Sequence, residues 1–261
     1  MTAVSVPPGL RGRGVLVTRP AARAGRLAAL IAGAGGEAVL FPTLEILSIP
    51  LQIQFMTGNS ADNIISDITV FVSPTAVEHG FAALQAGQAG RFAAVGSATA
   101  RELRARGISD VLVPEGPADS EALSALPELQ AGAVRGKRVL IVRGEGGRDW
   151  LRETLAGRGA QVEYLECYRR ARPAADPMPL LARWRSGGVA AVTMTSREAL
   201  DNLMAMLPGD GQALARATPL FAAHQRIAEH AHVLGMQQVR VAGPGDEAMI
   251  AGLQGFFATL A

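Results

Sequence analysis

The stretch VFVSPTAVEHGFAAL, residues 70–84, recurs later in the chain as VTMTSREALDNLMAM, residues 192–206, with Ser73 matching Ser196. Each copy has the pattern of an apolar strand, a serine at the strand end and the start of a helix. Three further blocks recur in the same order, at shifts between 123 and 129 residues. Self-similarity of this kind predicts two related halves. The other three pairs are GVLVTRP (14–20) with RVLIVRG (138–144), residues 92–113 with 221–241, and 117–126 with 243–253.

Length and composition limit the class of protein. A chain of 261 residues, 49% apolar and 18% charged, can bury a core and favours two domains over one. Lys137 is the only lysine, and the net charge of +2 is too small and too dispersed for a nucleic-acid-binding face. The arginines instead suit carboxylate or phosphate groups, which they bind in a forked geometry.

The single cysteine, Cys167, rules out an intrachain disulfide. No apolar run reaches the roughly 18 to 20 residues of a membrane-spanning helix. Residues 1–14 contain no basic segment followed by an apolar run, as a secretory signal would. We therefore expect a cytoplasmic protein with no nucleic-acid partner and no membrane partner.

Short apolar runs alternate with amphipathic helices in both halves. The runs are nearly continuous rather than alternating, which is typical of parallel strands covered by helices on both faces. The predicted fold class is α/β, doubly wound. The expected strands are residues 15–18, 38–41, 69–73, 92–95, 111–113, 139–142, 162–165, 190–195, 220–223 and 239–241.

Glycines and small polar residues mark the expected helix ends. Glycines in 33–36 and 157–159 suit the left-handed turn that ends a helix. Asp119 or Ser120, and Asp246, are expected N-caps, because their side chains can accept from free amides of the first turn. The segments 41–55 and 166–180 are rich in proline and β-formers and are expected to be extended linkers.

Seven motifs in this order resemble the uroporphyrinogen-III synthase family over residues 14–253. They are VLVTRP (15–20), FPTLEI (41–46), FVSPTAVE (71–78), AVGSATA (94–100), LIVRGEGGRDWL (140–151), ECYRR (166–170) and GDEAMIAGL (245–253). The resemblance implies two flavodoxin-like α/β domains with parallel sheets, joined by a two-stranded β connector. It places residues 1–42 with 180–261 in one domain and 56–166 in the other, with linkers at 43–55 and 167–179.

The resemblance also implies a cofactor-free lyase of heme biosynthesis. Its reaction is the cyclisation of hydroxymethylbilane to uroporphyrinogen III, with loss of water and inversion of ring D. The substrate is a linear tetrapyrrole, the protein is expected to be a monomer, and the upstream bilane-forming enzyme is a candidate protein partner. A two-domain binding protein that clamps an anionic metabolite without catalysis remains the alternative.

Ligands of open parallel sheets bind beyond the carboxyl ends of the strands, next to helix N-termini that favour anions. Substrate carboxylates are therefore expected there, and within ECYRR the resemblance makes Tyr168 the candidate general acid. Either matched serine can instead be a plain helix cap, either matched arginine a structural ion pair, and the tyrosine a packing residue. The substrate-binding candidates are Arg19, Ser73, Ser97, Thr99, Arg143, Gly144, Ser196, Arg197 and Arg226, with Arg148 as a further one.

Metal and nucleotide chemistry have little support. His230 and His232 are two residues apart and so do not share a helix face. GEGGRD, residues 144–149, opens a helix after a strand as a dinucleotide loop does, but Asp149 replaces the third glycine and its carboxylate would face a pyrophosphate. No metal and no cofactor is expected.

Overall fold

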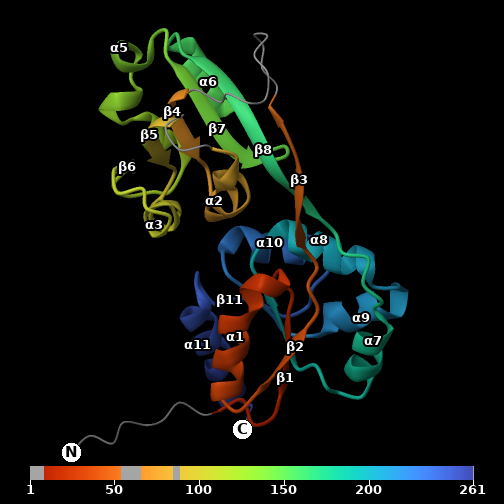
Figure 1. The fold of residues 1–261 in the computed structure, drawn as a ribbon. Coiled ribbons are helices and arrows are strands. Elements are labelled where there is room, and N and C mark those ends of the chain that lie inside the picture. The colour runs from red at the N-terminus through yellow and green to blue at the C-terminus, as the bar shows by residue number, and fades with distance from the viewer. Residues whose placement is uncertain (1–8, 54–65, 85–88, 261) are drawn as a thin grey trace, which may run out of the picture. The chain divides into compact units, whose positions relative to one another are not determined.

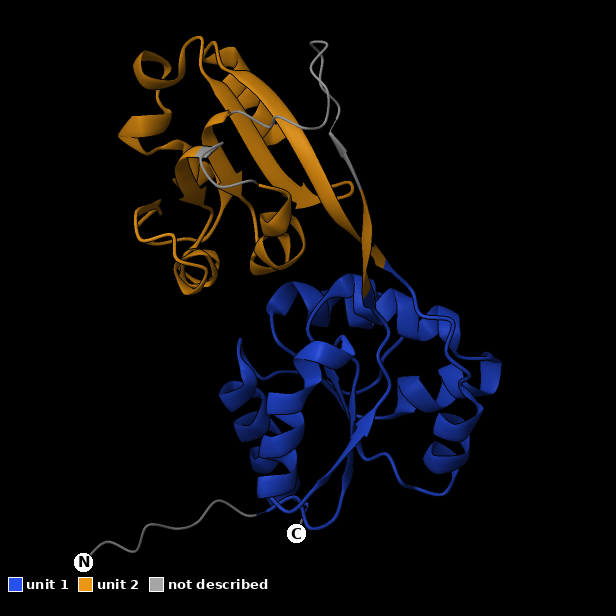
Figure 2. Cartoon of the chain, in the orientation of Figure 1, with its two compact units in different colours: residues 1–45, 171–261 blue, residues 46–170 orange. Residues whose placement is uncertain are grey.

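The computed structural model describes residues 9–53, 66–84 and 89–260. The chain forms two compact units, which are coloured separately in Figure 2. The first unit combines Met1–Glu45 with Ala171–Ala261, and the second is Ile46–Arg170. In the described part of the chain, no helix is both long enough and apolar enough to cross a membrane.

Five parallel strands form the sheet of the first unit, in the order β11-β10-β9-β1-β2. The strands β1 and β9 are buried along their whole length, as their continuous apolar sequences predict. The strands are β1 Gly14–Val17, β2 Glu37–Leu40, β9 Ala191–Met194, β10 Leu220–Ala222 and β11 Val239–Val241. The helices are α1 Ala21–Gly33, α7 Met178–Arg185, α8 Arg197–Met206, α9 Gly209–Ala217, α10 Gln225–Val233 and α11 Asp246–Ala258.

The sheet of the second unit has six strands, in the order β3-β8-β7-β4-β5-β6, and β8 to β6 pair in parallel. The strands are β3 Glu45–Ile53, β4 Ser66–Phe71, β5 Ala89–Ala94, β6 Val111–Leu112, β7 Arg138–Gly144 and β8 Gln161–Ala171. The α-helices, drawn in Figure 1, are α2 Pro74–Gly80, α3 Ser97–Ala105, α4 Ser120–Ser124, α5 Ala131–Val134 and α6 Trp150–Gly157. Two short 3₁₀ helices are Phe81–Ala83 and Pro127–Leu129.

Helices cover both faces of this second sheet. Side chains alternate along β7, so that Leu140 and Val142 enter a core cluster with residues of α2 and α3. Val139 and Ile141 enter a second cluster with residues of α4 and α6. The α/β class with parallel sheets is therefore confirmed, and the strand β7 is buried between two helical layers.

All ten expected strands are present, but the expected linkers are more ordered than extended loops. The segment 43–55 contains β3, which neighbours β8 in the sheet. β8 continues to Ala171 and so occupies the start of the segment 167–179. Because β3 and β8 are paired at the edge of the sheet, their backbone groups form hydrogen bonds that an isolated linker would lack. Tyr168, expected on the linker, accordingly lies inside a strand.

One extra residue interrupts the pairing of β7 with β8. Arg143 is opposite Glu166, but the next residue of β7, Gly144, is opposite Tyr168, which leaves Cys167 without a partner position. In an unbroken strand Tyr168 would share a face with Tyr164 and Glu166. The bulge turns Tyr168 to the other face, where it joins the cluster that contains Leu165 and Cys167.

Helix ends follow the sequence pattern with one exception. Asp119 caps α4 by accepting from the amide of Ala122, and Gly35 and Gly159 have the left-handed φ angles of 75° and 90°. Ser73 and Ser196 cap α2 and α8 by accepting from the amides of Ala76 and Ala199, both at 3.1 Å. The prediction of Asp246 as a cap is wrong: Gly245 occupies the cap position, with a φ of 89°, and Asp246 is the first helical residue.

Ser196→Ala removes the side-chain acceptor from the first turn of α8, so we expect the free energy of unfolding to fall by about 1 kcal/mol. Ser196→Asn keeps an acceptor at the cap and should remain close to the wild type. Urea unfolding midpoints of the three proteins measure both effects. An alanine variant as stable as the wild type would contradict the capping role.

Burial raises the pKa of the Cys167 thiol to about 11, and the side chain is 1% exposed. Because the thiolate is the reactive form, we expect iodoacetamide to label Cys167 rapidly in denaturant and only at the rate of transient opening in the native protein. Mass spectrometry of timed samples measures both rates. Equal rates in the two conditions would show that the bulge is accessible in the native state.

Candidate functional site

A pocket of about 240 Å³ lies in the second unit, at the carboxyl end of β7. It includes the loop between β7 and α6, where a ligand of a parallel sheet is expected. Three arginines, Arg143, Arg148 and Arg170, line it together with one carboxylate, Glu145. The other lining residues are Val72, Ser120, Ile141, Gly144, Gly146, Gly147, Leu151, Tyr164 and Tyr168.

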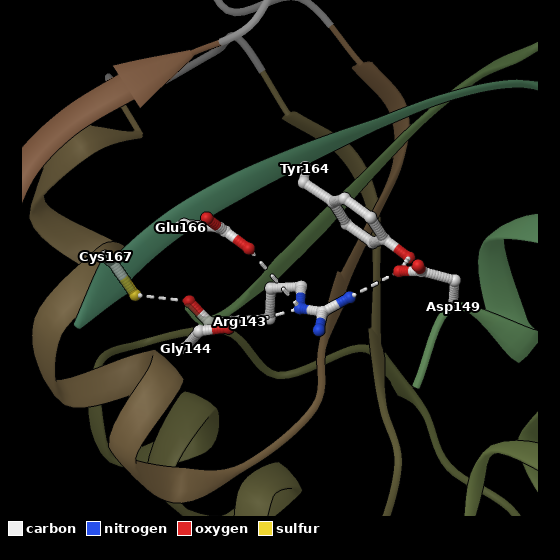
Figure 3. Close-up of polar contacts among 6 residues, drawn as sticks. All are labelled: Arg143, Gly144, Asp149, Tyr164, Glu166 and Cys167. Carbon is white, nitrogen blue, oxygen red and sulfur yellow. Dashed lines mark hydrogen bonds and ion pairs between the residues drawn. The ribbon is translucent and has the colours of Figure 1, made fainter. Parts of the chain in front are cut away.

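Arg143 is the last but one residue of β7, and its side chain is 7% exposed. Its Nη1 lies 3.2 Å from Asp149 Oδ1, and its Nε donates to the Gly144 carbonyl at 3.1 Å. Glu166 lies opposite in β8, with Oε1 3.9 Å from the same Nε. Figure 3 shows these contacts around the guanidinium. Arg143 thus lines the pocket and also forms a structural ion pair, so its assignment as a substrate-binding candidate and its assignment as a structural residue are compatible.

The ring of Tyr164 lies under that guanidinium, 4.4 Å from ring centroid to Cζ. Its hydroxyl donates to Asp149 Oδ1 at 2.9 Å. Burial, followed by this hydrogen bond to Asp149, raises the pKa of Tyr164 to about 12. The same hydrogen bond is the largest cause of the lowered pKa of Asp149. At neutral pH the phenol is therefore protonated and the carboxylate ionised.

Tyr168 lies on the opposite face of β8 and is 4% exposed. Its hydroxyl is 3.3 Å from Ser73 Oγ, and its ring is 5.7 Å from the ring of His79. His79 Nδ1 is in turn 2.9 Å from Ser48 Oγ. A Cβ at Gly144 would come within 2.6 Å of the Tyr168 ring, so only glycine at this position allows the ring to lie where it does. The absence of a side chain at Gly144 thus leaves the space that the Tyr168 ring occupies.

The remaining candidates of the second unit do not line this pocket. Ser97 is the exposed first residue of α3, and Thr99 is 3% exposed inside the same helix. Ser73 does not line the pocket. Its Oγ accepts from the Ala76 amide and lies 3.3 Å from the hydroxyl of Tyr168, which does line it.

Four candidates belong to the first unit. Arg19, at the end of β1, forms an ion pair with Asp246 of α11. Ser196 caps α8, and Arg197 is the exposed residue that follows it. Arg226 is exposed at the start of α10. Their places at strand ends and helix starts are as expected, while their ligand contacts stay predictions.

Sequence reasoning missed several lining residues, among them three with polar side chains. Ser120 was considered only as a cap, and Tyr164 and Arg170 were not proposed. The sequence carries no signal for Tyr164, because its place opposite Ile141 follows from the pairing of β8 with β7. Asp149, which argues against a dinucleotide loop, binds Arg143 and Tyr164 instead. Among the described residues, no three His, Cys, Asp or Glu side chains are grouped so as to hold a metal ion.

Comparison with known proteins identifies the family. The family model described as Uroporphyrinogen-III synthase HemD matches residues 25–251. Uroporphyrinogen-III synthase of Salmonella typhimurium is 34% identical over 248 residues, which cover 92% of this chain and 99% of the relative. The Escherichia coli enzyme of the same name is 33% identical over 249 residues, with the same coverage.

A solved structure agrees at the level of the fold. A mutant uroporphyrinogen III synthase from the extreme thermophile Thermus thermophilus superposes with a TM-score of 0.56 at 20% identity, over 95% of this chain and 98% of that one. The family match spans most of the chain, and both bacterial relatives align along nearly their whole length. The chain belongs to the uroporphyrinogen-III synthase family.

Proposed function

We propose that this protein cyclises hydroxymethylbilane to uroporphyrinogen III, with loss of water and inversion of ring D. The observation that carries the proposal is the family match over residues 25–251, together with relatives of 34% and 33% identity that bear this enzyme's name. Binding without catalysis, the alternative from the sequence, is not favoured by these relatives. The enzyme class that corresponds to the reaction is a cyclising hydro-lyase.

The reaction sets a problem of orientation. Loss of the substrate hydroxyl as water leaves an electrophilic azafulvene, which the already substituted position of ring D attacks to form a spiro intermediate. That intermediate fragments and recloses with ring D inverted. Because the free bilane also closes unaided to the uninverted isomer, the protein must hold this flexible substrate in one coiled shape. The conformational entropy is then lost on binding and not in the transition state, which lowers the activation barrier to inversion.

The arginines of the pocket supply groups for this task. Every pyrrole of the substrate carries carboxylate side chains, and the guanidinium groups of Arg143 and Arg148 are hydrogen-bond donors that suit them. A pocket of about 240 Å³ is below the roughly 300 to 1,000 Å³ of sites that enclose a whole small molecule. We infer that it takes a carboxylate arm of the substrate rather than the tetrapyrrole as a whole.

Tyr168 is the proposed general acid, which passes its proton to the departing hydroxyl. Ser73 Oγ already accepts the Ala76 amide, so its own hydrogen is free to point to the Tyr168 oxygen. In that arrangement the phenol proton remains available to the substrate. Ser73 therefore supports catalysis by orienting the tyrosine, in addition to its role as a cap.

The rest of the proposal comes from the sequence and the family. We propose flavodoxin-like domains, which the strand order of the first unit supports, since counted within the unit it is 2-1-3-4-5. We propose that β3 and β8, which are neighbours in the sheet, form the two-stranded connector. Substrate contacts of the other candidates, a monomeric state, the upstream enzyme as a partner and a cytoplasmic location stay predictions.

Isomer analysis tests the proposed function directly. Freshly made hydroxymethylbilane is given to the purified protein, and the porphyrins are oxidised and separated. We expect the inverted type III isomer to form faster than the spontaneous closure in a protein-free sample. Accumulation of the uninverted isomer alone, at the spontaneous rate, would refute the synthase activity.

Tyr168→Phe should lower kcat by roughly 100-fold or more, because a general acid acts mainly in the transition state, while KM changes by less than about threefold. Steady-state rates, corrected for spontaneous closure, measure both constants. Ser73→Ala is the matched variant: it keeps the phenol, loses the orienting hydroxyl and should show a smaller loss of kcat. Unchanged kcat in Tyr168→Phe would remove the tyrosine from the catalytic groups.

A further inference from the structure

The guanidinium of Arg143 is held on several sides by neighbouring groups of the protein. Asp149 binds Nη1, the Gly144 carbonyl binds Nε, and Tyr164 lies under the plane. Arg148, by contrast, is 68% exposed and pairs with the exposed Glu121. The difference marks Arg143 as an arginine whose direction is set by the protein before any ligand binds.

Tyr164 restrains the Arg143 guanidinium in two ways. Its ring supports the guanidinium at 4.4 Å, and its hydroxyl holds Asp149 Oδ1, the same oxygen that Arg143 Nη1 contacts. Figure 3 shows the phenol and the guanidinium meeting at this carboxylate. The phenol keeps its proton at neutral pH, since its pKa is raised to about 12. Arg143, Asp149 and Tyr164 therefore contact one another pairwise, and at neutral pH each keeps a fixed role as donor or acceptor.

Nη2 is the remaining nitrogen of this guanidinium. Within residues 9–53, 66–84 and 89–260 it donates no hydrogen bond. Gly147, with a φ of 103°, lies beside it, and a Cβ at that position would be 2.7 Å from Nη2. Glycine at this position thus leaves space beside this nitrogen, and both Gly147 and Arg143 line the pocket.

We propose that Tyr164 is a positioning residue for substrate binding. Together with Asp149 it holds Arg143 so that Nη2 meets a carboxylate arm of the bilane. Holding the guanidinium in place before binding reduces the side-chain entropy that is lost on complex formation. The inference rests on the proposed function and extends it to a residue that does not itself bind the substrate.

A double-mutant cycle tests the proposal by steady-state kinetics with hydroxymethylbilane. Tyr164→Leu removes both ring and hydroxyl and should raise KM about tenfold, with kcat within about twofold. Tyr164→Phe keeps the ring and should raise KM by only about threefold, which is rescue by the conservative variant. Arg143→Met should raise KM at least as much as Tyr164→Leu. In the Arg143→Met background, Tyr164→Leu should then add less than about twofold.

Glu163→Gln is the matched control, because Glu163 neighbours Tyr164 in β8 but points to the other face. Its KM should equal that of the wild type. A Tyr164→Leu effect of the same size in both Arg143 backgrounds would overturn the proposal, since it would show a role independent of the arginine. If Tyr164→Leu does not fold, the cycle is run with Tyr164→Phe and the same criterion.

Failure of this inference is distinguishable from failure of the proposed function. A protein that makes the type III isomer but shows no KM change in Tyr164→Leu keeps the function and loses the positioning role. Unchanged KM in Arg143→Met likewise refutes both the arginine contact and its positioning. Absence of the type III isomer with the wild type refutes the synthase activity itself.

Discussion

The pairing of β7 with β8 is the constraint on which the candidate site depends. Cys167 is the extra residue in β8, so the faces of that strand exchange between Glu166 and Tyr168. Tyr164 consequently lies beside Arg143, while Tyr168 lies against α2 and contacts Ser73. Without the extra residue, both tyrosines would project from one face, and Tyr168 could not meet its serine. A single bulge therefore divides the site into an arginine group and a tyrosine group.

Glycine makes the same arrangement possible on the β7 side. The Tyr168 ring occupies the space that a Cβ of Gly144 would need, and the absence of a Cβ at Gly147 leaves space beside the Arg143 Nη2. In the loop 144–149, which resembles a dinucleotide fingerprint, Gly144 and Gly147 therefore make room for the side chains of Tyr168 and Arg143. Its Asp149 is bound to Arg143 and Tyr164, so the carboxylate that argues against a nucleotide serves to hold a guanidinium.

The two units do not coincide with the two halves of the internal duplication. β1 of the first half pairs with β9 of the second half, and β4 of the first half pairs with β7 of the second. Each sheet is thus built from both repeats. Because the repeats are related, the sequence is compatible with either a sheet per half or this exchange. In the folded chain, β3 follows β2 but lies next to β8 in the sheet of the second unit, so the chain has left the first sheet by β4.

Sequence by itself determined the α/β class, the ten strands of the repeats and the family, because continuous apolar runs and ordered motifs are local properties. From motif positions it also proposed Arg143, Gly144 and Tyr168, all three of which line the pocket. It did not place Ser97 and Thr99 outside the pocket, nor find Tyr164 and Arg170 within it. Those placements depend on strand order and on the bulge at Cys167, and both are set by pairing between segments that only the folded chain brings together.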